Sequence, residues 1–183
     1  MKKLLYLMLL SVSVLGANEL EIKCNQGNLK ACAVLGLVYY DNKNYTKAKD
    51  LWTKSCDVGI ALSCTNLGLL CRKGLGVKQD YSKARKFYTK ACDGKDFMGC
   101  FNLGFLYEKG LGVTRDYTKA SSFYTKACNN KNALSCTNLG VLYSDGKGVR
   151  KDKRKAKEYL GKACDLGDYN GCRNYEILKE QGY

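Results

Sequence analysis

Residues 100–128 read CFNLGFLYEKGLGVTRDYTKASSFYTKAC, and this stretch decides the fold. In its first part, Leu103, Leu106 and Tyr107 recur at the spacing that places side chains on one face of an α-helix. The two glycines of the following G-L-G-V segment end that helix, because glycine favours the conformations that stop one. The stretch therefore begins with a short amphipathic helix and a turn.

A second helix follows this turn. Asp116 stands where a helix needs an N-cap, and Asp80 and Asp152 stand at the same place in neighbouring stretches. Small and aromatic residues then recur at helical spacing, namely Ala120, Phe123, Tyr124 and Ala127. Lysines occupy the positions between them, so we expect this helix to be amphipathic with lysine on its outer face.

The helix pair repeats along the chain with a period of 36 residues. The period is set by two series of cysteines, Cys64, Cys100, Cys136 and Cys172, and Cys56, Cys92, Cys128 and Cys164. A period in this range is typical of stacked helical pairs. The sequence therefore predicts an all-α fold, a right-handed α/α solenoid.

The repeat also predicts how the chain is divided. We expect a signal peptide over residues 1–17 and one solenoid domain over 18–183. The domain comprises an N-terminal capping helix (18–30), a short repeat (31–62), three full repeats (63–98, 99–134 and 135–170) and a C-terminal capping helix (171–183). The first repeat is four residues shorter, because Asp41-Asn42-Lys43-Asn44 replaces the glycine loop. In the last helix Glu176 replaces the repeated glycine, as expected where no further helix packs.

The spacing of the cysteines predicts disulfides between successive helices. Eight residues along an uninterrupted helix would separate two Cα atoms by about 12 Å, beyond the limit of about 7 Å for a disulfide. Turns such as Asp93-Gly94-Lys95-Asp96 must therefore intervene. The predicted pairs are Cys24–Cys32, Cys56–Cys64, Cys92–Cys100, Cys128–Cys136 and Cys164–Cys172. Cys71 is left over, as a buried free thiol or as one half of an intermolecular disulfide.

The composition argues against a metal site or a cofactor. The chain has eleven cysteines and no histidine, and every regular cysteine pair is spaced C-x7-C instead of the C-x2-C of zinc sites. The glycine loops lack the G-x-G-x-x-G continuation after a strand that a dinucleotide site needs. We therefore expect no metal, no cofactor and structural disulfides, which form in exported proteins.

The N-terminus and the charge point to an exported, basic protein. Lys2 and Lys3 precede an apolar run from Leu4 to Leu15, which is typical of a signal peptide and too short to span a bilayer. The chain carries a net charge of +14, or +12 once Lys2 and Lys3 are removed. Such a surface favours acidic partners, although nucleic acid is not expected outside the cytoplasm. The predicted location is secreted or periplasmic, without a transmembrane segment.

The motif L-G-x-x-Y followed by A-x3-F/Y resembles the tetratricopeptide repeat, and the longer period with its G-x-G-V loop resembles the Sel-type variant. The C-x7-C spacing in every unit is similar to that of the Helicobacter cysteine-rich proteins. This resemblance implies TPR-like helix pairs and two functions. One is the binding of proteins or ligands, and the other is penicillin binding with weak β-lactamase activity.

The residues themselves do not support a catalytic site. A serine β-lactamase needs S-x-x-K with S-D-N and K-T-G elements, and only the first is present, at Ser144 and Lys147. That match falls where a helix ends, in the position of ordinary turn residues in the other repeats. We therefore predict no catalytic residue, and the β-lactamase alternative depends on the resemblance alone.

The predicted function is a binding scaffold with a groove lined by the first helix of each repeat. An asparagine precedes the helical Leu-Gly of the three full repeats, at Asn66, Asn102 and Asn138, and Asn174 occupies the equivalent position of the last helix. These amides could hold an extended backbone or a glycan, or satisfy the backbone of the neighbouring repeat. The remaining predicted groove residues are Phe101, Phe105, Leu69 and Val141, with Arg72, Lys73 and Lys109 at the rim. The apolar members are also compatible with ordinary packing.

The partners expected for this groove are an extended peptide, a protein, a peptidoglycan fragment or, by the resemblance, a β-lactam, and we expect a monomer. Trp52 aligns with Tyr88 and Tyr124, and we expect all three in the core.

Overall fold

The computed structural model describes residues 16–183, so most of the predicted signal peptide lies outside the described residues. Residues 16–25 are helical. Nine further helices follow in the described part: α2 Leu29–Asp41, α3 Tyr45–Asp57, α4 Ala61–Lys73, α5 Tyr81–Asp93, α6 Phe97–Lys109, α7 Tyr117–Asn129, α8 Ala133–Asp145, α9 Lys153–Asp165 and α10 Tyr169–Glu180. No helix in residues 16–183 is long and apolar enough to cross a membrane.

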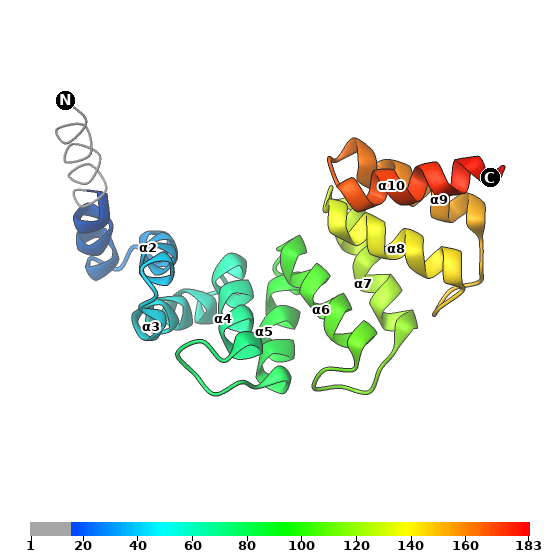
Figure 1. Cartoon of the computed structure of the whole chain (residues 1–183). Coiled ribbons are helices and arrows are strands. Elements are labelled where there is room, and N and C mark those ends of the chain that lie inside the picture. The colour runs from blue at the N-terminus through cyan, green and yellow to red at the C-terminus, as the bar shows by residue number, and fades with distance from the viewer. Residues whose placement is uncertain (1–15) are drawn as a thin grey trace, which may run out of the picture.

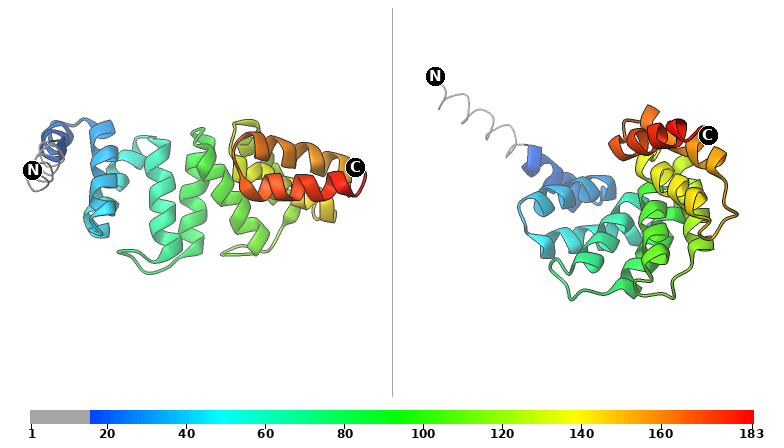
Figure 2. Two further views of the ribbon diagram at one scale, coloured as in Figure 1. Left: turned by 45° about the horizontal axis from the view of Figure 1, so that its top comes forward. Right: turned by 45° about the vertical axis from the view of Figure 1, so that its right-hand side comes forward.

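The helices stack in chain order along a curved array, as Figure 1 shows, and the turned views of Figure 2 show the same succession. Each helix packs on the one before it and the one after it. In addition, α4 contacts α6 and α8 contacts α10. These contacts between alternate helices place the even-numbered helices on the inner side of the curve. The predicted all-α solenoid of helix pairs is thus confirmed.

The caps that begin and end the helices are those expected from the repeat. The carboxylate of Asp116 accepts a hydrogen bond from the Lys119 backbone N–H at 2.9 Å, and Asp80 and Asp152 cap α5 and α9 in the same way. At the other end of α6, Gly110 adopts a left-handed φ of 69°. The second loop glycine, Gly112, also has a positive φ and lies against the backbone of Tyr81 at the start of α5. The glycine loop therefore ends one helix and also packs on the preceding repeat.

The five disulfides join the end of each odd-numbered helix, or of the helix at residues 16–25, to the next even-numbered helix. Their Cα–Cα distances run from 4.4 to 4.9 Å, as is usual for a disulfide. The pairs are Cys24–Cys32, Cys56–Cys64, Cys92–Cys100, Cys128–Cys136 and Cys164–Cys172, the same as the spacing predicts. Cys71 is free and buried, and burial is the main reason that the pKa of its thiol is raised.

One large side chain from each odd-numbered helix fills the space behind the preceding even-numbered helix. These side chains are Trp52, Tyr88, Tyr124 and Leu160, each at most 2% exposed, which places the three aromatic residues in the core as expected. A glycine faces each of them, at Gly36, Gly68, Gly104 and Gly140. The recurring glycine of the L-G motif therefore makes room for a core side chain of the next helix.

Candidate ligand-binding groove

Each even-numbered helix presents one row of side chains on the inner side of the curve. The row follows the spacing i, i+4, i+7 and i+11, which keeps side chains on one face of a helix. In α6 it comprises Met98, Asn102, Phe105 and Lys109. In α4 it comprises Leu62, Asn66, Leu69 and Lys73. The predicted asparagines thus alternate with apolar residues, and a charged residue closes each of these two rows.

The apolar members of these rows are exposed to solvent. Of the twelve large hydrophobic residues that are exposed in the described part of the chain, seven belong to these rows and are 36–46% exposed. They form what we call the apolar row: Val34, Leu37, Leu62, Met98, Leu134, Val141 and Ile177. Isolated exposed hydrophobic residues are ordinary, whereas a set that follows one face through five helices indicates a binding surface.

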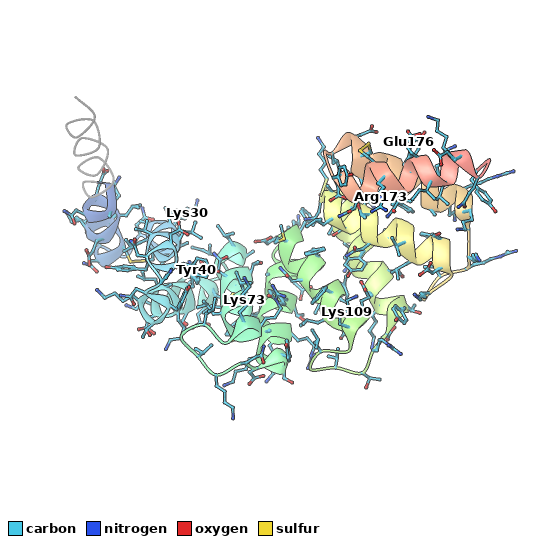
Figure 3. The ribbon with its side chains drawn as sticks, in the orientation of Figure 1. Lys30, Tyr40, Lys73, Lys109, Arg173 and Glu176 are labelled. Carbon is cyan, nitrogen blue, oxygen red and sulfur yellow. A yellow bond between two sulfur atoms is a disulfide. The ribbon has the colours of Figure 1, made fainter. Side chains whose placement is uncertain are left out.

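Basic side chains accompany the apolar row. Figure 3 shows Lys30, Tyr40, Lys73 and Lys109 following one another along the helices from α2 to α6, and Arg173 on α10. The cations of Arg72 and Lys109 lie over the ring of Phe105, at 5.7 and 5.9 Å from its centroid. The structure therefore brings together three of the predicted groove residues from two adjacent repeats.

The asparagines differ from one another in their contacts. The Asn102 side chain is nearly buried and donates to the backbone oxygen of Met98 at 2.9 Å, within its own helix and not to the neighbouring repeat. The amide nitrogen of Asn66 is buried without a hydrogen-bond partner among the described residues. Asn138 lies beside the Tyr124 phenol, whereas Asn174 lines a cavity between α8 and α10. The four asparagines share a position but not a common set of bonds.

A polar residue of each full repeat faces the buried core residue of the next helix. In repeat 3, the Tyr124 hydroxyl donates to the Glu108 carboxylate at 2.7 Å. Burial, followed by this contact, raises the pKa of the Tyr124 phenol. In repeat 2, the guanidinium of Arg72 occupies the place of Glu108, and the Tyr88 hydroxyl has no hydrogen-bond partner of good geometry among residues 16–183. Burial raises the pKa of Tyr88 to about 12.

Repeat 4 has a cavity at this place. Leu160 stands where the other full repeats have tyrosine, and it lines a cavity of about 330 Å³ between α8 and α10. Val141, Ile177 and Leu178 supply apolar walls, and the polar lining comes from Ser144, Asp145, Lys153, Asn174 and Gln181. Both Val141 and Ile177 belong to the apolar row, so the cavity lies beside the groove and could receive one side chain of a ligand.

Ser144 has a basic neighbour, but not the one that its S-x-x-K motif suggests. The ammonium group of Lys153 donates to the Ser144 hydroxyl at 3.0 Å. The ammonium group of Lys147 instead pairs with the Asp145 carboxylate at 2.8 Å. The motif is therefore a turn, as the repeat register indicates, and the serine–lysine contact forms across the loop to the next helix.

Some residues of the site were missed by sequence reasoning. Leu62, Met98 and Leu134 lie one turn before the predicted asparagines, and the i, i+4 spacing could have identified them. Phe101, by contrast, packs inward against Tyr124, with ring centroids 6.0 Å apart. Since Phe101 also packs on the core between repeats 2 and 3, its ring contributes to the core of the array.

Comparison with known proteins gives a consistent set of relatives. The Sel1 repeat matches residues 29–59, 61–96, 98–132 and 133–168. A protective antigen of uropathogenic Escherichia coli that displays an SLR fold is similar, with a TM-score of 0.85, 30% identity and coverage of 89% of this chain and 36% of that one. A Sel1 repeat protein from Oxalobacter formigenes has a TM-score of 0.78, 28% identity and coverage of 82% and 62%.

Two further relatives differ in how much of them is matched. Helicobacter pylori cysteine rich protein B is 32% identical, with a TM-score of 0.56, and the match covers 69% of this chain and 91% of that one. A component of an ERAD-associated E3 ubiquitin-protein ligase from Candida glabrata is 40% identical over 55 residues. This chain spans 7% of that protein, and about a third and under two thirds of the first two structures.

Proposed function

Because this chain belongs to the Sel1 repeat family and resembles the Helicobacter cysteine-rich proteins, we propose that it is a binding scaffold that holds an extended segment of a partner protein in its groove. Sel1 repeats are typical of protein-binding proteins. The observation that carries the proposal is the apolar row, which leaves seven large side chains exposed along one face. An extended peptide matches this geometry, because its alternate side chains can contact successive helices.

The charges beside the row suit an acidic partner. Lys30 and Lys73 have no carboxylate at ion-pair distance among residues 16–183, whereas Lys109 pairs with Glu108 of its own helix. Unpaired cations around an apolar surface favour segments that carry both acidic and apolar residues. The cavity beside Leu160 would receive a large apolar side chain near one end of that segment.

The test begins with selection of peptides from a random phage library on the oxidised protein. We expect the selected peptides to combine acidic and large apolar residues. Met98→Glu and Val141→Glu should each weaken their binding about tenfold or more, since both place an unpaired charge in the apolar contact. Val58→Glu is the matched control, because Val58 is 60% exposed in a turn outside the apolar row. Equal affinity for all three variants would refute the groove as the binding surface.

A peptidoglycan fragment is the other ligand class that the sequence suggests. A soluble muropeptide can be measured in the same assay, with the same three variants. If only the muropeptide binds, and Met98→Glu and Val141→Glu abolish its binding, then the groove is the binding surface but its partner is the cell wall and not a protein.

The proposed location is outside the cytoplasm, in the periplasm or beyond the cell. Five disulfides among the described residues support it, because disulfides persist in oxidising compartments. Fractionation of cells that express the tagged chain tests this proposal. Recovery of the oxidised protein in the cytosolic fraction would contradict it.

The contact between Ser144 and Lys153 favours a second candidate function, slow acylation by a β-lactam. The Lys153 ammonium donates to Ser144 in this contact, and once it has lost a proton to solvent its amine could accept the serine proton as the hydroxyl oxygen attacks the β-lactam carbonyl carbon. The oxidised protein would be incubated with a chromogenic cephalosporin, and turnover and adduct mass would be measured. An adduct that disappears in Ser144→Ala supports this function, whereas absence of both turnover and adduct eliminates it.

A further inference from the structure

The segment that leads into α9 is far more basic than its counterparts. Residues 150–157 read RKDKRKAK, with six cations and one acid, which gives a net charge of +5. The corresponding segment of repeat 2, residues 78–85, reads KQDYSKAR and has a net charge of +2. In repeat 3, residues 114–121 read TRDYTKAS, with a net charge of +1. Since all three form the same loop and first helical turn, the fold itself does not require this charge.

The position of these cations on α9 is electrostatically unfavourable. Lys153, Arg154 and Lys155 are the first three residues of the helix, whose N-terminus already carries a partial positive charge. The acid of the segment, Asp152, uses its side chain to accept the Lys155 backbone N–H at 2.9 Å. The other full repeats place tyrosine and a small hydroxyl residue in the first two of these positions. The cations of repeat 4 therefore cost stability without serving as caps.

No carboxylate among residues 16–183 lies within 4.0 Å of the cationic groups of Arg150, Lys151, Lys153, Arg154 or Lys155. In the other full repeats the lysine equivalent to Lys155 does lie near its capping aspartate, with Nζ–Oδ2 distances of 3.8 Å for Lys83 and 3.5 Å for Lys119. Lys155 instead lies over the Tyr143 ring, 5.6 Å from its centroid. Of the six cations in the segment, Lys157 donates to the backbone oxygen of Tyr183, and the other five have no carboxylate at ion-pair distance in the described part of the chain.

These five cations line one hollow. Its volume is about 770 Å³, and Tyr143, Val149, Tyr183 and one acid, Asp152, complete its lining. The hollow is formed by the loop between α8 and α9, near the C-terminal end of the array in Figure 1. This hollow is separate from the apolar row, because none of the residues of that row lines the hollow. A surface that gathers five cations into one depression, against the helix dipole, has the properties of an anion site.

We propose that this hollow binds a compact soluble ligand that carries several phosphate or sulfate groups on a sugar or polyol. Arginine and lysine together suit such groups, because guanidinium binds two oxygens of one group and ammonium binds as a point charge. Five cations in one hollow call for a ligand with several anionic groups. The concave shape suits a compact ligand, whereas a membrane would present a flat surface.

The test compares two variants with the same loss of charge. The first carries Lys151→Gln, Arg154→Gln and Lys155→Gln, and it keeps Lys153 in contact with Ser144. The matched control carries Lys78→Gln, Lys83→Gln and Lys86→Gln, three exposed lysines at the corresponding junction of repeat 2. The probes are inositol hexakisphosphate and a sulfated heparin hexasaccharide, measured by calorimetry at about physiological ionic strength. Vesicles that contain phosphatidylglycerol form the third arm.

We expect the unaltered protein to bind at least one soluble probe, the first variant to lose about tenfold or more in affinity, and the control to change less than about twofold. A preference for one soluble probe identifies the anionic group as phosphate or sulfate. Equal losses in the two variants would show that net charge, and not the hollow, is responsible, and would overturn the proposal. Binding to the vesicles without binding to either soluble probe would also overturn it. Circular dichroism at far-ultraviolet wavelengths verifies that both variants are folded.

Discussion

Gly104 of α6 faces the ring of Tyr124 of α7 so closely that a Cβ atom at position 104 would lie 2.8 Å from two of the ring carbons. The Tyr124 ring is fully buried and its hydroxyl is bonded to Glu108, so it has little freedom to move away. The glycine is therefore required by packing and not by backbone conformation, because position 104 lies inside a regular helix.

Gly104→Ala should destabilise the protein by about 1–3 kcal/mol, the usual cost of overpacking a core. This loss occurs even though alanine favours a helix by about 1 kcal/mol relative to glycine. Gly161→Ala is the control, since its added Cβ would meet only the edge of Tyr175 at 3.3 Å. Urea unfolding of both variants is the measurement. A Gly104→Ala variant as stable as the parent would contradict the packing described here.

Removal of the hydroxyl group from Tyr88 and from Tyr124 should change the free energy of unfolding at neutral pH by different amounts. Tyr124→Phe removes a hydrogen bond to a carboxylate and should cost about 1.5–3 kcal/mol. Tyr88→Phe removes a buried hydroxyl that lacks a partner of good geometry, so its effect should be close to zero or stabilising. The two variants remove the same atom from equivalent repeat positions. Equal losses in urea unfolding would show that the Tyr88 hydroxyl is bonded after all.

The protein should lose stability as the pH rises above 10. Burial raises the pKa of Tyr88 from 10 to about 12, so between these values the unfolded chain binds fewer protons than the folded one. The contribution of Tyr88 to stability then falls with rising pH, and this contribution is fully present below pH 10. A shift of this size corresponds to about 3 kcal/mol by pH 12. Tyr88→Phe should flatten the decline, which denaturant titrations at a series of alkaline pH values would reveal.

Reduction of the five disulfides should strongly lower the midpoint temperature of thermal unfolding. Each C-x7-C disulfide closes a short loop and contributes roughly 2.5 kcal/mol on the chain-entropy estimate. Cys71→Ala should leave the sensitivity to reductant unchanged, because Cys71 forms no disulfide. The double variant Cys92→Ser, Cys100→Ser removes the disulfide in the middle of the array. It should lower the thermal midpoint of the oxidised protein. A midpoint that does not move with reductant would rule out a structural role for the disulfides.

Leu160→Tyr should fill part of the cavity between α8 and α10. Gly140 faces Leu160 as Gly104 faces Tyr124, so the helix pair already has room for a ring. Filling the cavity should raise the free energy of unfolding by about 0.5–2 kcal/mol. Leu160→Tyr should also weaken the binding of peptides that place a side chain in the cavity, whereas the Val58→Glu variant should still bind them. Destabilisation by Leu160→Tyr would mean that the other tyrosines occupy a different environment.

The sequence was sufficient for the features that repeat. The 36-residue period predicted the helix pairs, the position of Asp116 predicted its capping bond, and the cysteine spacing predicted disulfides that need a turn. Each of these depends on local backbone geometry, which short sequence patterns determine directly. The buried position of Trp52 followed from its alignment with Tyr88 in the same way.

The features that break the repeat could not be predicted as easily. The cavity beside Leu160 depends on how much volume the neighbouring helices leave after they pack, and no residue pattern states that volume. The contact of Ser144 with Lys153 crosses from one helix to the next. The S-x-x-K motif indicates Lys147 as the neighbour of Ser144 and could not predict this contact. The apolar row was only partly identified, because Met98 lies one turn before the asparagine that marked the groove.

The disulfides also determine what a protease can do to this molecule. The turn between α5 and α6 carries Lys95 with a left-handed φ of 65°, a place where trypsin could cut. A cut there opens the backbone, but Cys92 and Cys100 keep the two sides covalently joined. A cut in a glycine loop, for example after Lys78, leaves only packing to hold the parts together. The boundaries between repeats are thus tolerant of cleavage, and the loops within repeats are where digestion would take the array apart.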